Sequence, residues 1–288
     1  MFHYLKKTLL TLCLIGSLLC SQVLAQKKLF PEAPGIVSYT YRNQFAKDAL
    51  STLEMIKGSG ITDIEFSSLF NQAPEDLRKK CDENGIKCSS YGVSYEDLVN
   101  KTDEVAKTAR TLGATYVRVA GIPHKGAFTL DNAKQAVADF NKYGKLLKDN
   151  YGLTFIYHNH GFEYQPYEDG TLYDYLLKNT DPKYVSMELD ILWAFLPGQD
   201  PAQLLNKYSN RYKALHMKDL KKGVERGSLS GGTAKDNDVI LGSGQIDFPA
   251  VIKAARKAGV KHYYIEDESS SSVTQVPESI KYLNSLKD

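Results

Sequence analysis

Two histidines spaced two residues apart are the part of this chain best suited to chemistry. His158 and His160 end a run of strand-forming residues in the segment LTFIYHNHGFEY, residues 153–164, and the chain has only six histidines. Successive side chains of a strand point to opposite faces, so residues at this spacing point the same way. Two imidazoles on one face at the end of a strand can bind a metal ion or transfer protons.

Three further strand-like segments end in residues of the same kind. Glu188 and Asp190 share a face, as do His216 and Lys218, and Glu266 lies near the end of the last segment. A mixed set of imidazoles and carboxylates suits Mn²⁺, Zn²⁺, Co²⁺ or Fe²⁺ better than an ion that prefers oxygen ligands alone. Any single histidine is better explained as an ordinary hydrogen-bonding residue of a loop. One His, one Asp, a second His and one Glu from four successive strand ends favour a divalent metal site.

Eight strand-like segments must position these side chains, and they alternate with helical patterns. The strands are predicted at residues 35–41, 62–67, 87–92, 115–121, 153–160, 184–190, 212–219 and 262–267. Helices are predicted between them, at residues 48–57, 74–83, 95–112, 130–150 and 249–257. This alternation predicts parallel strands joined by helical crossovers, and eight of them fit a (β/α)8 TIM barrel, with a doubly wound open sheet as the alternative. Active sites of TIM barrels lie at the C-terminal strand ends, where these polar residues gather.

The N-terminus has the pattern of a secretory signal peptide. Lys6 and Lys7 precede an apolar run that extends to about Cys20. The run is too short and wrongly flanked for a spanning helix. We therefore predict a signal peptide over residues 1–25, cleavage after Ala25, and a single TIM-barrel domain over residues 26–288 that is exported to the periplasm or secreted, with no membrane span. A buried N-terminal helix and a lipoprotein modified at Cys20 are the alternatives.

Charge and cysteine content limit the remaining possibilities. The formal net charge is +2 and acids and bases are interspersed, which argues against a nucleic-acid partner. Cys81 and Cys88 remain in the mature chain, where a disulfide and two ordinary buried thiols are both open. The long Gly- and Ser-rich stretch 221–247 is predicted to be a functional loop over the same end of the barrel.

Several segments together resemble a known family. They are LTFIYHNHGFEY, MELDILWAF, ALHMKDL, LGSGQIDFPAVIKAARKAGV, HYYIEDE and the opening GIVSYTYRNQFAKDALSTLEMIKGSGITDIEF. They resemble the sugar phosphate isomerase/epimerase family of xylose isomerase-like TIM barrels (the AP endonuclease 2 superfamily). That family includes tagatose/psicose epimerases, inosose dehydratases and hydroxypyruvate isomerases, with endonuclease IV as a distant relative. The resemblance covers almost the whole mature chain, and the motifs are specific through their common order and spacing.

The resemblance implies which residues bind the metal. The family takes Glu, Asp, His and Glu from strands five to eight, and the last three match Asp190, His216 and Glu266. The first Glu falls on His158, which is a departure from the pattern. In the epimerases the two glutamates also form the acid/base pair. The implied metal ligands are therefore His158, Asp190, His216 and Glu266, and the implied catalytic residues are Glu266 and His160.

Other residues are implied to contact a substrate or lie near it. Lys218 belongs to the family's H-x-K-D motif, and Trp193 stands where relatives often carry His and could stack on a sugar ring or cover the core. Glu65 and His124 are candidate substrate-binding residues with weaker motif support. Glu163 is either a loop ligand or a solvated charge. Arg42 is either part of the site or a solvated residue at the start of a helix.

The function implied is that of a metal-dependent sugar isomerase or epimerase. It would act on a small-molecule carbohydrate, an unphosphorylated sugar or keto-sugar, through an enediolate-type intermediate. The alternatives are a keto-sugar lyase or dehydratase, and a non-catalytic carbohydrate-binding protein that needs no metal. Endonuclease activity is rejected because the chain lacks a basic face and enough ligands for a trinuclear zinc cluster. No oligomeric state is predicted.

Overall fold

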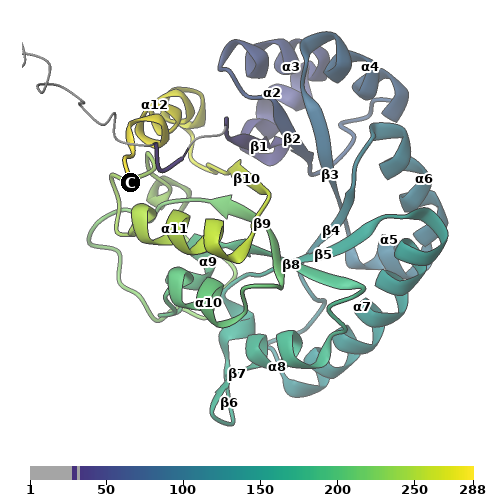
Figure 1. Cartoon of the computed structure of the whole chain (residues 1–288), viewed down its shortest axis with the longest axis vertical. Helices are drawn as coiled ribbons and strands as arrows, with labels where there is room; N and C mark the ends of the chain where they lie inside the picture. The colour runs from purple at the N-terminus through teal and green to yellow at the C-terminus, as the bar shows by residue number, and fades with distance from the viewer. Residues whose placement is uncertain (1–27, 31–32) are drawn as a thin grey trace, which may run out of the picture.

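Eight parallel strands close into a barrel, in the order β1-β10-β9-β8-β5-β4-β3-β2 (Figure 1). The structure is a computed structural model that describes residues 28–30 and 33–288, so the predicted signal peptide lies outside the described residues. The strands are β1 (Gly35–Val37), β2 (Asp63–Phe66), β3 (Lys87–Val93), β4 (Tyr116–Ala120), β5 (Thr154–His158), β8 (Val185–Asp190), β9 (Tyr212–Met217) and β10 (His262–Ile265). The predicted TIM barrel is confirmed, and the open sheet is excluded.

Several predicted strands run past their observed ends. His160 and Lys218 follow β5 and β9 instead of belonging to them, and the first strand turns into the short 3-10 helix η1 (Ser38–Tyr41). The chain leaves the hydrogen-bonded ladder here because polar side chains turn toward the mouth of the barrel. Between β5 and β8, two short strands form a hairpin that stands away from the barrel, β6 (Pro166–Tyr167) and β7 (Gly170–Thr171) (Figure 1).

Helices surround the barrel and cover its strands (Figure 1). They are α2 (Arg42–Lys47), α3 (Ala49–Gly58), α4 (Pro74–Asn84), α5 (Tyr95–Asn100), α6 (Thr102–Leu112), α7 (Leu130–Tyr151), α8 (Leu172–Asn179), α9 (Ile191–Phe195), α10 (Pro201–Lys207), α11 (Phe248–Ala258) and α12 (Ser272–Ser285). The single helix predicted over 95–112 is wrong, since Lys101 leaves helical geometry between α5 and α6. Four helices, α4, α6, α7 and α11, end at a glycine in the left-handed conformation, for example α6 at Gly113, where φ is 80°.

The buried core of the barrel has two parts. Most buried apolar side chains lie between the strands and the surrounding helices. A smaller cluster consists of Val37, Ile156, Ala214 and Tyr264, one residue from each of four strands. In a TIM barrel such inward-pointing residues fill the interior, so it is a packed core and not a pore.

The described residues settle the question of the two cysteines and contain no candidate membrane span. Cys81 and Cys88 are both buried free thiols and do not form a disulfide. Within residues 28–30 and 33–288, no helix has the length and apolar character needed to cross a membrane.

Candidate active site

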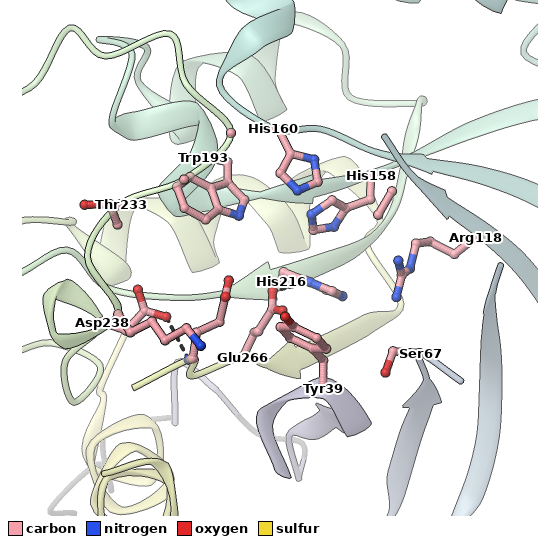
Figure 2. Close-up of a pocket in the computed structure, with 15 residues that line it drawn as sticks. Tyr39, Ser67, Arg118, His158, His160, Trp193, His216, Thr233, Asp238 and Glu266 are labelled. Carbon is pink, nitrogen blue, oxygen red and sulfur yellow. Dashed lines mark hydrogen bonds and ion pairs between the residues drawn. The ribbon is translucent and has the colours of Figure 1, made fainter. Parts of the chain in front are cut away.

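A cavity of about 430 Å³ opens among the C-terminal ends of the strands. It is lined by Tyr39, Ser67, Arg118, Ala120, His158, His160, Trp193, His216, Gly231, Gly232, Thr233, Lys235, Asp238, Glu266 and Glu268. In the view of Figure 2, His158, His160 and Trp193 lie along one side, with His216, Glu266 and Tyr39 facing them. The cavity is therefore at the end of the barrel where the sequence predicted a site.

The side chains of the consecutive residues His158, Asn159 and His160 make different contacts. His158 ends β5 and its Nδ1 lies 3.1 Å from Glu188 Oε2. Asn159 turns the other way and holds the backbone of Asp190, accepting from its N–H at 3.0 Å and donating to its carbonyl at 3.3 Å. His160 lines the cavity. The middle residue thus fixes the position of a predicted ligand on the neighbouring strand.

The four predicted metal ligands come together. His158 Nε2 lies 4.0 Å from Asp190 Oδ2, and His216 Nδ1 lies 2.8 Å from Glu266 Oε2. Ligand atoms of Asp190, His216 and Glu266 all lie within 4.8 Å of one another. All four residues are buried. Two imidazoles and two carboxylates at this spacing are a donor set for a divalent transition-metal ion.

An unsatisfied oxygen tests whether these residues fit a cation. Asp190 Oδ2 is buried without a hydrogen-bond partner, and burial raises the pKa of Asp190 to about 8. A buried polar atom normally has a partner, and this one lies 4.0 Å from His158 Nε2 in a residue that is grouped with His216 and Glu266. A bound cation would satisfy this oxygen.

His216 joins the ligand set to a second, deeper group of charges. Burial disfavours its charged form, but the carboxylates of Glu188 and Glu266 outweigh burial and raise the pKa of His216 well above its usual value. Its Nε2 lies 3.1 Å from Glu188 Oε2 and 3.2 Å from Glu65 Oε1. Arg118 in turn binds Glu65, with Nη2 at 2.7 Å from Oε1. Glu65 therefore supports His216 and Arg118 from behind the cavity wall.

A second triplet of potential ligands is a poorer cation site. His158, Glu188 and His216 also bring ligand atoms within 4.8 Å of one another. However, Arg118 Nε lies 3.8 Å from Glu188 Oε2, so a cation there would face a guanidinium group. The set around Asp190 and Glu266 is the better candidate.

His160 has a neutral imidazole held between aromatic rings. Its ring stacks on Phe162 at 5.6 Å between centroids and on Trp193 at 6.0 Å. Burial lowers the pKa of His160 to about 4, and its Nδ1 is buried without a hydrogen-bond partner. An uncharged imidazole in the wall of a cavity, with one nitrogen that has no partner, is suited to accept a proton or a hydrogen bond from a substrate hydroxyl.

Glu163 is neither a loop ligand nor a solvated charge, so both predicted alternatives are wrong. Its carboxylate is fully buried and accepts from the backbone N–H of His160 at 2.9 and 3.0 Å and from the hydroxyl of Tyr157. Burial raises the pKa of Glu163 to about 7. The residue fixes the backbone that carries His160.

Three predicted substrate-contacting residues lie outside the cavity lining: Glu65, Lys218 and His124. Lys218 is fully buried, donates to Glu268 Oε1 at 2.5 Å, and lies 4.7 Å above the ring of Trp193. His124 packs on Phe162, with ring centroids 4.4 Å apart. Trp193 does line the cavity, with one part of its ring covered by the Lys218 ammonium group.

The long connection between β9 and α11 covers part of the cavity, as its composition predicted. Gly231, Thr233 and Asp238 of this loop line the cavity. Asp219 anchors the returning end, since its carboxylate accepts from the backbone N–H groups of Gly242, Gly244 and Ile246 at 2.8, 2.9 and 3.1 Å. A Cβ at Gly244 would lie 2.3 Å from Asp219 Oδ1, so glycine is required there.

Several lining residues were missed in the sequence, and Arg118 carried a signal. It is a charge in the middle of the otherwise apolar strand TYVRVAG, which is costly unless it is paired. Glu188, which lies behind the lining, was noted in the sequence for sharing a face with Asp190 but was given no role. Arg42 is not simply solvated: its guanidinium lies 4.6 Å from the ring centre of Tyr39 and donates to the carbonyl of Glu268 at 2.9 Å.

Comparison with known proteins agrees with this geometry. The family described as xylose isomerase-like TIM barrel matches residues 50–286. The chain belongs to this family. A sugar phosphate isomerase/epimerase from Parabacteroides distasonis has 28% sequence identity and a TM-score of 0.70, covering 92% of this chain and 96% of that one. The IOLI protein, whose structure holds a zinc atom, has 15% identity and a TM-score of 0.69, covering 88% of this chain and 95% of that one.

Curated members of the family that resemble this chain include inosose dehydratases. The protein from Geobacillus thermodenitrificans is 30% identical over 148 residues, which cover 49% of this chain and 48% of the relative. The chain thus spans about half the length of the curated relatives it matches. Membership of the xylose isomerase-like family and the arrangement of polar residues at the barrel mouth together support a sugar-modifying enzyme.

Proposed function

We propose that this protein is a metal-dependent enzyme that removes a proton next to the carbonyl group of an unphosphorylated keto-sugar. The observation that carries the proposal is the convergence of His158, Asp190, His216 and Glu266 beside a cavity that the two histidines and Glu266 line, with Asp190 Oδ2 buried and unpartnered. These four residues would hold Mn²⁺, Zn²⁺, Co²⁺ or Fe²⁺, which as a Lewis acid would acidify the C–H bond beside the carbonyl and favour an enediolate-type intermediate.

Two residues of the cavity wall are in the protonation state needed to accept that proton. Burial would raise the pKa of Glu266, but Lys218 and His216 outweigh it and hold the pKa far below its usual range, so the carboxylate is ionised. His160 is neutral at pH 7 because burial lowers its pKa to about 4. Glu266 is the proposed base, and His160 is the proposed partner that binds a hydroxyl or accepts a proton at the opposite side of the cavity.

Elimination is the outcome that the site favours over epimerisation. Epimerisation in the resembling enzymes uses a carboxylate from strand five and another from strand eight. Strand five here supplies His158, whose Nδ1 is directed to Glu188. A single carboxylate base suits loss of water or of another leaving group after proton abstraction. The inosose dehydratase relatives support the same assignment.

Isomerisation or epimerisation is the second candidate, and His160 is the observation that favours it. A neutral imidazole with a free Nδ1 could return a proton to the other face of the intermediate. The Parabacteroides distasonis structure, a sugar phosphate isomerase/epimerase, supports this candidate over nearly the whole chain.

The cavity offers little to a phosphate group. Arg118 is paired with Glu65, and Lys218 is paired with Glu268. These buried cations are already neutralised, so a phosphate dianion would gain little from them. An exported protein, as the N-terminal pattern predicts, would also meet unphosphorylated sugars.

A screen in D₂O separates the candidates. Metal-loaded protein is incubated with unphosphorylated sugars and 3-keto sugars, and the products are followed by NMR. Loss of water with a new C=C bond would identify a dehydratase, whereas deuterium beside the carbonyl in an intact sugar would identify an isomerase or epimerase. If no sugar exchanges hydrogen with fully metal-loaded protein, the enzymatic proposal is wrong and a carbohydrate-binding protein becomes the better account.

A further inference from the structure

One carboxylate oxygen lies behind both histidines of the candidate metal site. Glu188 Oε2 is 3.1 Å from His158 Nδ1 and 3.1 Å from His216 Nε2, and the Glu188 side chain is fully buried. A histidine that binds a divalent ion does so as a neutral imidazole with one N–H, and the N–H that faces Glu188 Oε2 can donate to it. The nitrogens left free for a metal ion are then His158 Nε2 and His216 Nδ1.

These free nitrogens face the two carboxylate ligands. His158 Nε2 is directed to Asp190 Oδ2 at 4.0 Å, and His216 Nδ1 is directed to Glu266 Oε2 at 2.8 Å. One residue behind the two rings therefore sets the direction of both. His216 has an additional support in Glu65 Oε1 at 3.2 Å, whereas Glu188 is the hydrogen-bond partner that the structure shows for His158.

Glu188 is not placed to be a ligand itself. Its Oε2 faces Arg118 Nε at 3.8 Å, and Arg118 is fixed by Glu65. A cation bound at Glu188 would be close to that guanidinium group. The carboxylate therefore acts on the metal site through the histidines.

We propose that Glu188 is a positioning residue that fixes the tautomers and the ring orientations of both histidine ligands. Where the resembling enzymes have a strand-five glutamate in the ligand set, this chain would have an imidazole there with a carboxylate directly behind it. A carboxylate in this position orients the ring and makes it a stronger donor, and its loss typically changes metal affinity by about 10–100-fold. The inference rests on the proposed metal dependence.

Two variants of Glu188 and one matched control test this role. The affinity of the metal-free protein for Zn²⁺ is measured by competition with a chromophoric chelator. Glu188→Gln should weaken it by about 10–100-fold, because an amide carbonyl is a weaker acceptor than a carboxylate and its NH₂ group can only donate. Glu188→Asp keeps the charge but withdraws the oxygen by one methylene group, so it should also bind more weakly. Asp63→Asn, which alters a carboxylate 2.6 Å from His262 Nδ1 at the other end of the barrel, should bind like the wild type.

A second readout reports the tautomers directly. In ¹⁵N NMR spectra of the Zn²⁺-loaded wild-type protein, His158 should carry its proton on Nδ1 and His216 on Nε2. The opposite tautomers would overturn the inference. So would folded Glu188→Gln or Glu188→Asp protein that binds Zn²⁺ within about two-fold of the wild type. If the wild-type protein itself binds no divalent metal ion, the proposed function fails and this inference fails with it.

Discussion

At the scale of residues, the segment His158-Asn159-His160 combines three tasks in three consecutive positions. His158 is directed toward the candidate metal ligands, Asn159 fixes the backbone of Asp190, and His160 faces the cavity. Glu163 then holds the backbone N–H of His160. A small change in this segment therefore affects the ligand set and the proposed proton acceptor together.

The first prediction concerns the proposed base. Glu266→Gln should keep the fold but lower turnover by about 10²–10⁴-fold, the usual effect of losing general acid/base catalysis. Glutamine has nearly the same size and one similar oxygen, but it cannot accept a proton at neutral pH. Rates are compared at saturating metal, because Glu266 is also a proposed ligand. Hydrogen exchange at the wild-type rate would show that the base lies elsewhere, with His160 as the next candidate.

The second prediction concerns pH. Burial raises the pKa of Asp190 to about 8, and neighbouring carboxylates raise that of His216 despite burial. Both groups hold a proton in the metal-free protein at pH 7, and a metal ion must displace it. The affinity for Zn²⁺ should therefore rise with pH between pH 6 and 8, by up to about ten-fold per pH unit for each proton displaced. Calorimetry in buffers of different ionisation enthalpy counts the protons released. A pH-independent affinity between pH 6 and 8 would refute this.

At the scale of elements, the β9–α11 loop depends on one buried carboxylate. Asp219 is 1% exposed and accepts three backbone hydrogen bonds at the end of the loop. Asp219→Asn removes one acceptor and should cost about 1–3 kcal/mol of unfolding free energy. It should also speed amide hydrogen exchange over residues 238–246. Asp200→Asn is the control, since Asp200 accepts backbone N–H groups at the exposed start of α10, where Asn is as good a cap. Equal exchange rates in both variants would contradict the anchoring role.

The elements also show what the sequence could and could not predict. All eight barrel strands were found, because each is a short apolar run followed by polar residues and separated by a helical pattern. Their ends were less certain, because departure from the ladder at His160 or Lys218 depends on tertiary contacts. The break at Lys101 was missed for the same reason. The buried pairing of Arg118 with Glu65 joins residues 53 positions apart, which no local pattern reveals.

At the scale of the whole molecule, the barrel brings four strand ends to one cavity while its interior remains packed. The closeness of His158, Asp190, His216 and Glu266 was predictable because strand order fixes which strand ends are neighbours. The supporting residues Glu188, Glu65 and Arg118 became visible only in three dimensions.

Export is the prediction that belongs to the scale of the whole molecule. When the full-length chain is expressed in a Gram-negative bacterium, the protein should be found in the periplasm, and its intact mass should match a chain that begins at Gln26. Cytoplasmic protein that retains residues 1–25 would contradict it.

The metal content of the purified protein tests the central claim most directly. After dialysis against metal-free buffer, elemental analysis of the wild-type protein should find close to one divalent transition-metal ion per chain, and His216→Ala should retain only a small fraction of it, because loss of one ligand from about four leaves the ion poorly held. Wild-type protein that is active without metal, or His216→Ala protein with the wild-type metal content, would contradict the proposed site.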